Sequence, residues 1–152
     1  MNRQDFLARV AAVESEYRIA LLSVENLRAV ASKDPAILRK ARLTMAGLEA
    51  CQQNLEPTYV VRLFAEFETP LRLYWRDARK RKSWNTIGAE ALIEGVASYR
   101  RVPADVLRET QKVREFRNTL VHRSGREGVA ALTLRQCRSS LCRFLSFLPL
   151  RW

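Results

Sequence analysis

Apolar residues recur three and four positions apart along most of this chain, and they nowhere alternate with polar residues as in a half-buried strand. The longest such run predicts a first helix from Arg3 to about Ala31, with a buried stripe that comprises Phe6, Val10, Val13, Tyr17, Ala20, Leu21, Val24, Leu27 and Ala31. Only 5 Gly and 5 Pro interrupt the 152 residues. The spacing therefore predicts an all-α fold, an up-and-down bundle of five or six helices.

Capping residues and prolines divide the rest of the chain into further helices. Asp34-Pro35 predicts the start of a second helix ending near Asn54, because Asp is a good N-cap and Pro fits the first helical position. A third helix is expected from about Pro57, with a kink near Pro70 rather than a break. Its stripe is rich in aromatic residues and comprises Val60, Leu63, Phe64, Phe67, Leu71, Tyr74 and Trp75.

Three more helices are expected after the basic segment 78–85, which predicts an exposed connection. A short helix covers about residues 86–98, and a longer one runs from Pro103 to the vicinity of His122, with Ser124-Gly125 as its C-terminal cap. Thr133 stands three residues before Gln136, the spacing of a capping box at the start of the last helix.

The balance of charge points toward a polyanionic partner. Lys and Arg outnumber Asp and Glu by 27 to 16, a formal net charge of +11. A charge of this size repels itself unless counterions or a polyanion offset it, so nucleic acid is the first partner to consider. The alternative is that the charge serves only solubility.

Cys51, Cys137 and Cys142 form neither an even disulfide framework nor a CxxC pair, and we expect three reduced thiols in a cytoplasmic protein. The first ten residues are charged where a signal peptide needs an apolar run, and no apolar segment is long enough to span a membrane. The single histidine argues against a His-based metal site, and the chain has no GxGxxG, GxxxxGK[ST] or GxSxG motif. We expect no metal and no organic cofactor.

The most informative residue is Arg117, because a helical projection of residues 103–123 places it inside the apolar stripe formed by Val106, Val113, Phe116 and Leu120. An unpaired buried charge is costly. Arg117 must therefore meet a carboxylate, for which Glu68 is the best candidate, extend to an edge, or line a cavity or interface that receives an anion.

Asn118 and His122 are four residues apart and share a helical face, so their side chains can reach one another. The imidazole at the end of a helix can give or take a proton near neutral pH. The alternative role for His122 is purely structural, the capping of a terminal carbonyl group.

The run Arg114-Glu115-Phe116-Arg117-Asn118-Thr119-Leu120-Val121-His122 resembles the RNxxxH signature of the HEPN superfamily, the higher eukaryotes and prokaryotes nucleotide-binding domains. The surrounding helices extend the resemblance over about residues 55–150, from the helix bearing Phe67-Glu68 to the closing segment before Pro149. On this basis residues 1–152 form one HEPN-like domain, with its core in 55–150 and an N-terminal helical pair in 1–54.

The resemblance implies a homodimeric, metal-independent endoribonuclease of the toxin–antitoxin or defence type. Its composite Arg/His site comprises Arg117, His122, Asn118 and Glu68. One straight helix places Arg117 and His122 about 140° apart, and a two-fold dimer would bring two copies of each into one cleft. The residues expected to contact RNA are Arg76, Arg79, Lys80, Arg81, Lys82, Trp84, Arg114 and Arg123.

Two other functions compete with the ribonuclease. The first is a catalytically inactive HEPN-like module that binds RNA or nucleotide, or that docks a nucleotidyltransferase antitoxin. The second is a basic helical adaptor in which Arg117 completes a buried ion pair with Glu68. An enzyme requires Arg117 and His122 to open into one positively charged cleft, whereas the adaptor requires Arg117 to be paired and sealed.

Overall fold

The computed structural model describes residues 2–79, 87–122 and 129–152. In these ranges the protein is all-α, with six helices and no strand apart from an isolated bridge between Asn2 and Arg151. The helices are α1 (Arg3–Lys33), α2 (Ala36–Lys40), α3 (Met45–Ala78), α4 (Ala89–Arg100), α5 (Ala104–His122) and α6 (Leu134–Leu145). None of the described helices is long and apolar enough to span a bilayer.

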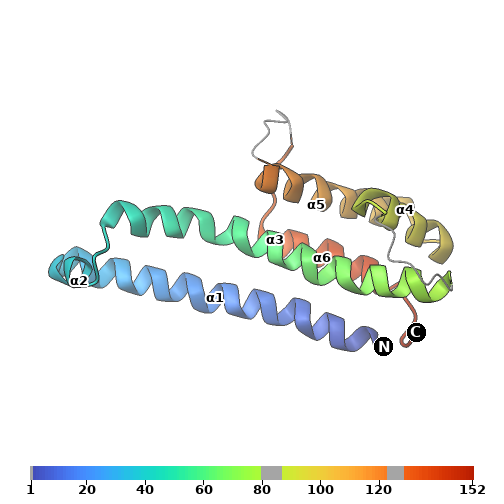
Figure 1. Ribbon diagram of the computed structural model, residues 1–152, viewed down its shortest axis with the longest axis horizontal. Helices are drawn as coiled ribbons and strands as arrows, with labels where there is room; N and C mark the ends of the chain where they lie inside the picture. The colour runs from blue at the N-terminus through green and yellow to red at the C-terminus, as the bar shows by residue number, and fades with distance from the viewer. Residues whose placement is uncertain (1, 80–86, 123–128) are drawn as a thin grey trace.

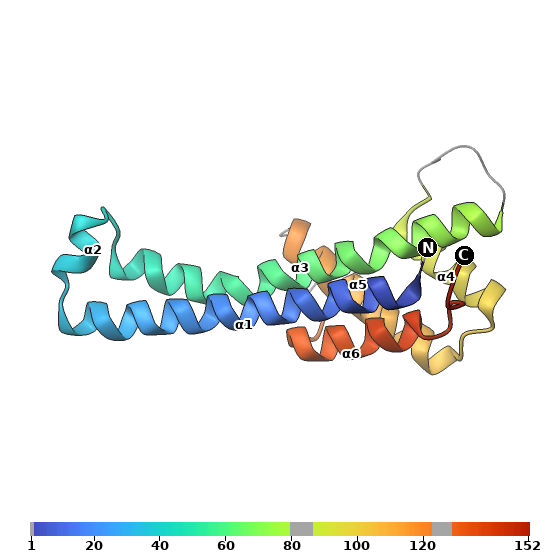
Figure 2. The same ribbon diagram turned by 90° about the horizontal axis from the view of Figure 1, so that it is seen from below.

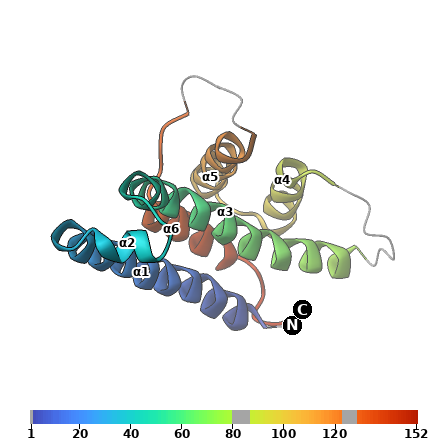
Figure 3. The same ribbon diagram turned by 60° about the vertical axis from the view of Figure 1, so that its left-hand side comes forward.

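The two long helices, α1 and α3, run antiparallel and side by side, as Figure 1 shows, with α6 beside both of them. Helices α4 and α5 cover the opposite side of α3 from α1 (Figure 3). Beyond α6, the C-terminal part of α1 and the N-terminal part of α3 project as a two-helix arm with α2 at its tip (Figure 2). The bundle therefore has a layered body and one long extension.

The hydrophobic core lies where α1, α3 and α6 meet and continues under α4 and α5. Phe64, Phe67 and Phe144 are fully buried, and the rings of Phe67 and Phe144 meet edge to face with centroids 5.6 Å apart. This arrangement is one that aromatic pairs prefer. Val10 and Val13 of α1 belong to the same buried cluster, so the N-terminal helix contributes to the body as well as to the arm.

Most predicted helix boundaries are confirmed. Helix α1 begins at Arg3, α5 follows Pro103 and ends at His122, and Thr133 forms a capping box with Gln136 at the start of α6. The carboxylate of Glu56 on α3 also accepts a hydrogen bond from the backbone N–H of Leu134, at 2.8 Å. That contact ties the first turn of α6 to α3.

The predicted helix over 35–54 is wrong. Asp34 does accept a hydrogen bond from the Ala36 N–H, at 3.0 Å, but α2 ends at Lys40. The chain then reverses through Arg42, whose φ is 56°, and Thr44 caps the N-terminus of α3. A reversal here lets α3 return along α1, so that both apolar stripes are buried together.

The predicted boundary near Pro57 is also wrong, because α3 runs without a break through Pro57 and Pro70 for 34 residues. A proline removes one backbone hydrogen bond, here the bond to the carbonyl four residues earlier, at Gln53. Gln53 is exposed, so water can replace that bond. The predicted connection over 78–85 and the Ser124-Gly125 cap lie largely or wholly outside the described residues.

Candidate functional site

Helix α5 positions the candidate residues by burying one face against α3, α4 and α6. Val106, Thr110 and Val113 are fully or almost fully buried on that face. The Thr110 hydroxyl donates to the Val106 carbonyl oxygen at 2.9 Å, which satisfies the only neutral polar side chain buried there among the described residues. Continuing at helical spacing, the same face reaches Arg117, as the sequence predicts.

Arg117 extends from α5 onto α3, and its guanidinium carbon lies 5.3 Å from the centre of the Phe64 ring. Its Nη1 donates a hydrogen bond to the Oδ1 atom of Asn118 at 3.0 Å. Its Nε atom is buried and has no hydrogen-bond acceptor among the described residues. A charged group is thus held in place by an aromatic ring and an amide, and no carboxylate of the described ranges pairs with it.

Glu68 does not pair with Arg117, which corrects the predicted ion pair. The Oε1 atom of Glu68 instead accepts hydrogen bonds from Nε and Nη2 of Arg72, with the Nε bond at 2.8 Å. Nη1 of Arg72 donates to the Ile87 carbonyl oxygen at 3.1 Å, ahead of α4. Because Arg72 is one helical turn from Glu68, this pair forms without ordering a side chain from another helix.

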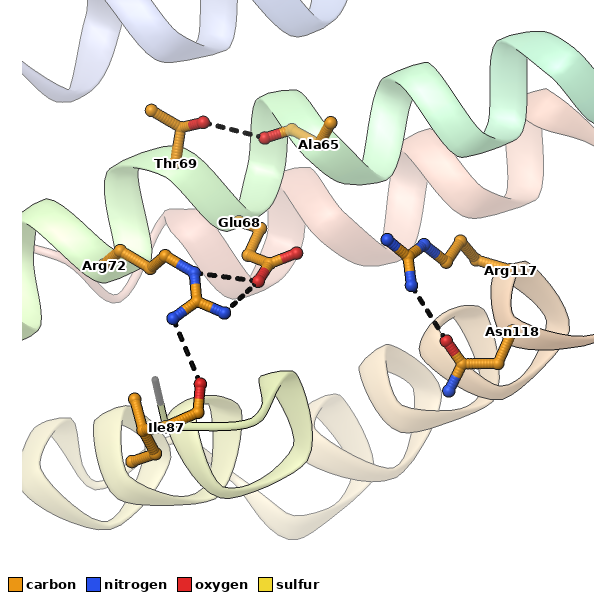
Figure 4. A network of polar contacts seen from close by, with 7 residues as sticks. All are labelled: Ala65, Glu68, Thr69, Arg72, Ile87, Arg117 and Asn118. Carbon is orange, nitrogen blue, oxygen red and sulfur yellow. Dashed lines mark hydrogen bonds and ion pairs between the residues drawn. The ribbon is translucent and has the colours of Figure 1, made fainter. Parts of the chain in front are cut away.

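Figure 4 shows Glu68 between Arg72 and Arg117, at the place where α3 faces α5. Phe64, Glu68 and Arg72 are four residues apart, so α3 presents them on one face. Glu68 pairs with Arg72 only, so the three side chains Glu68, Arg72 and Arg117 carry a net charge of +1 at a half-buried location. A preorganised guanidinium with unused N–H groups is suited to oxygens of phosphate or carboxylate, which it binds bidentately.

His122 is the last residue of α5 and is exposed. Arg117 donates a hydrogen bond to Asn118. Asn118 therefore orients Arg117, in addition to the predicted role beside His122. One chain brings together Arg117, Asn118 and the Glu68–Arg72 pair, and His122 follows Asn118 by about one helical turn at the end of α5.

Arg114, expected to contact RNA, is the most buried charged residue of the described chain, with 9% of its surface exposed. Its Nε donates to Gln111 at 2.5 Å, and its Nη2 lies 3.3 Å from a carboxylate oxygen of Glu90 and 3.7 Å from one of Glu115. The contact with Glu90 ties α5 to α4, and the other two lie within α5. A phosphate could reach Arg114 only by displacing them.

Two more of the residues expected to contact RNA, Arg76 and Arg79, lie at the end of α3. Arg76 is half-buried, and Arg79 is exposed with its guanidinium carbon 4.4 Å from the centre of the Trp75 ring. Residue 79 lies about 22 Å along the helix axis from residue 64. Lys80, Arg81, Lys82, Trp84 and Arg123 lie outside the described residues. Sequence reasoning missed Arg72, although its position four residues after Glu68 was a usable signal.

The thiols show no features of a nucleophile. Burial, reinforced by the charge of Glu56, raises the pKa of the Cys137 thiol to about 12. Burial also raises the pKa of Cys142, although Arg138 opposes that shift. Cys51 is exposed, on the arm. Among the described residues no three His, Cys, Asp or Glu side chains gather in a way that could ligate a metal ion.

No protein-family model matches the chain, and neither a curated protein nor a solved structure gives a match. The group around Arg117 and the net charge of the whole molecule are therefore the features that bear on function.

Proposed function

We propose that this protein is a metal-independent endoribonuclease of the HEPN type, in which Arg117 binds the scissile phosphate and His122 transfers a proton. The observation that carries the proposal is the state of Arg117. Its guanidinium is fixed against Phe64 and Asn118 with no carboxylate partner among the described residues, in a chain whose net charge is +11. A cation held in this way is arranged for an anion that arrives from outside.

RNA is the polyanion that such a site can both bind and cleave without a metal. Its 2′-hydroxyl attacks the adjacent phosphorus, loses its proton, and displaces the 5′-oxygen, which takes a proton as it leaves. The products are a 2′,3′-cyclic phosphate and a free 5′-hydroxyl. Arg117 stabilises the charge that develops on the phosphate oxygens, and the imidazole of His122 gives or takes one of the two protons.

Glu68 and Arg72 support the site as a matched pair. By accepting both hydrogen bonds at Oε1, Glu68 holds Arg72 beside α4 and remains next to Arg117 without neutralising it (Figure 4). Arg72 and Arg76 continue along α3 at four-residue spacing from Glu68, toward Arg79. This line offers the RNA backbone a series of cations that leads away from the scissile phosphate.

One chain has one His122, at the end of α5. In the proposed homodimer, a two-fold axis near the ends of two α5 helices places the partner's His122 opposite Arg117. The composite cleft then contains two arginines and two histidines, one of which takes the proton while the other gives one.

The test uses purified wild type, Arg117→Met and His122→Ala with a mixed-sequence RNA in EDTA. Wild type should produce fragments with 2′,3′-cyclic phosphate ends. His122→Ala should retain salt-sensitive RNA binding and lose cleavage by at least about 100-fold, the usual contribution of a general acid or base. Arg117→Met should lose both binding and cleavage.

Arg108→Met provides the matched control, because Arg108 is an exposed arginine of α5 that makes no ion pair with a described residue. It should cleave RNA like wild type. RNA that remains intact with wild type while binding persists would instead favour the inactive binding module. Absence of both binding and cleavage would favour the adaptor.

A further inference from the structure

The outer face of α1, turned away from α3, is uncharged over more than five helical turns. It comprises Ala8, Ala11, Ala12, Ser15, Ile19, Leu22, Asn26, Ala29 and Val30, and all of them are exposed. Ile19 and Leu22 are 64% and 59% exposed. In a chain in which 28% of residues are charged, a solvent-facing helix surface would be expected to carry Lys, Arg or Glu. Helix α1 therefore has a second apolar stripe in addition to the one buried in the bundle.

The spacing of this stripe is that of a coiled coil. Positions 8, 12, 15, 19, 22, 26 and 29 are separated alternately by four and three residues, which is the heptad pattern of a and d positions. Ile19 occupies an a position and Leu22 a d position, and Asn26 stands at the next a position. A polar residue at a single a position fixes the register of the pair of helices that forms such a contact.

We propose that this face binds the same face of a second copy of the chain in antiparallel orientation, about a two-fold axis between residues 20 and 21. In this register Ile19 packs on the partner's Leu22. Ser15 lies opposite the partner's Asn26, so each polar side chain meets a hydrogen-bonding partner. Ala12 lies opposite the partner's Ala29, which lets the helices approach closely. Because the contact is isologous, each pairing occurs twice.

Charge complementarity selects the second copy as the occupant. The register places Arg18 beside the partner's Glu25, and the two-fold axis repeats this pair. Both residues are exposed, and neither makes an ion pair with another described residue of its own chain. A parallel arrangement in the same heptad register would place Arg18 near the partner's Ser23 and Glu25 near the partner's Val30, with no such pair. The antiparallel homodimer alone uses both charges.

This contact is separate from the site around Arg117, since α1 and α5 lie on opposite sides of α3 (Figure 1). It also differs from the α5 interface on which the composite ribonuclease site depends. Either interface can form without the other.

The test is sedimentation of Arg18→Glu, Glu25→Arg and the double variant beside wild type. Each single variant places like charges together twice, and should weaken self-association about tenfold or more; the double variant restores both pairs and should return to within about threefold of wild type. Arg108→Glu on α5 makes the same charge change elsewhere and should leave the association constant of the α1 contact unchanged. Circular dichroism checks that each variant is folded.

A second measurement reports the orientation directly. In an oxidised mixture of Ile19→Cys and Leu22→Cys chains, the antiparallel register predicts mixed disulfides between the two variants. Leu22→Cys chains linked to one another would overturn the orientation, and a double variant as weak as the single variants would overturn the register. Wild type that is monomeric at every concentration reached would overturn both this contact and the proposed α5 dimer. Wild type that self-associates with an affinity that the Arg18 and Glu25 variants leave unchanged would overturn the α1 contact alone.

Discussion

Trp75 occupies the space that the missing side chain of Gly95 leaves on α4. A Cβ atom at residue 95 would lie 2.8 Å from the Cη2 atom of Trp75 and 2.9 Å from Cζ2. The indole is half-buried and packs against the core, so it cannot move aside as the end of a flexible chain could. In most helix interiors alanine is favoured over glycine by about 1 kcal/mol, and at this position the overlap reverses the preference.

We expect Gly95→Ala to lower the free energy of unfolding by up to about 2 kcal/mol, the usual cost of overpacking less the gain in helix propensity. Urea denaturation measures the change. A Trp75→Phe background lacks the indole atoms Cη2 and Cζ2 that the new Cβ atom would meet. In that background, Gly95→Ala should be neutral or stabilising. Equal destabilisation in both backgrounds would show that the indole is not the cause.

Cys137 makes stability depend on alkaline pH. Burial raises the pKa of its thiol from 9.0 to about 12, so between these values the native state keeps a proton that the unfolded state has lost. The unfolded state then binds fewer protons, and the free energy of unfolding falls by about 1.4 kcal/mol per pH unit as pH rises above 9. Below pH 9 the contribution is fully present.

Cys137→Ala removes this dependence while the raised pKa values of Cys142 and Tyr17 remain. Wild type should therefore lose stability faster than Cys137→Ala when urea denaturation is repeated from neutral pH to above pH 9. Parallel pH profiles of the two proteins would contradict the assignment.

At the level of single residues, the sequence predicted the position of Arg117 better than it predicted the partner of its side chain. The helical projection placed Arg117 on the buried face of α5, and it lies there. The predicted ion pair between Arg117 and Glu68 was wrong because Glu68 pairs with Arg72, which lies four residues later on the same helix. That spacing is visible in the sequence. Arg114 was expected on the surface, although its spacing from Val106 and Thr110 places it on the buried stripe.

At the level of helices, the end of α4 shows a strain that the sequence did not reveal. Arg101 has φ 53°, the left-handed conformation, and the Val102 N–H donates to the Ala97 carbonyl oxygen at 2.9 Å. Glycine is the usual residue at this place in such a helix end, since a Cβ atom raises the energy of left-handed backbone by about 1–2 kcal/mol.

Arg101→Gly should therefore raise the free energy of unfolding by about 0.5–1 kcal/mol, because part of the relief is offset by the greater freedom of glycine in the unfolded chain. Thermal and urea denaturation measure the gain. Arg101→Ala removes the same side chain and keeps the Cβ atom, and it should give no comparable gain. A similar rise in both variants would assign the effect to the charge of Arg101.

Capping chemistry explains which helix starts could be predicted from the sequence. Helices α1, α5 and α6 begin at residues whose side chain or missing N–H favours a helix start, so local chemistry sets their limits. The reversal at Arg42 is set by the pairing of α1 with α3, because arginine has no preference for a positive φ. Pro57 suggested a boundary from local chemistry, and tertiary packing overrode it.

Over the whole molecule, arginines engage most carboxylates of the described chain, and cations remain in excess. Arg62 pairs with Glu16 and Arg138 with Glu14, which joins α3 and α6 to α1. By contrast, the tip of the arm gathers Lys33, Arg39, Lys40 and Arg42, all of them exposed and without a salt bridge to a described residue. Repulsion among such groups opposes folding and weakens as salt screens it.

Raising the salt concentration from about 10 mM to about 150 mM should therefore increase Tm by about 2–4 °C, the shift that 1 kcal/mol produces in a domain of this size. Differential scanning calorimetry over a series of sodium chloride concentrations measures it, and the rise should flatten once screening is complete. A steady fall of Tm with salt would show that the ion pairs outweigh the repulsion.

The ends of the described chain are joined to each other. The guanidinium of Arg3 donates to the carbonyl oxygens of Ser146 and Leu148, at 2.6 and 2.7 Å, and the ring of Phe6 stacks on Trp152 with centroids 5.9 Å apart. On a ribosome, the first turn of α1 emerges before its partners have been synthesised. The α1–α3 hairpin needs only local loop closure and can form early, whereas these contacts close the longest loop in the chain. Residues at the start of α1 are thus made before the end of α6 and are among the last to reach their native neighbours.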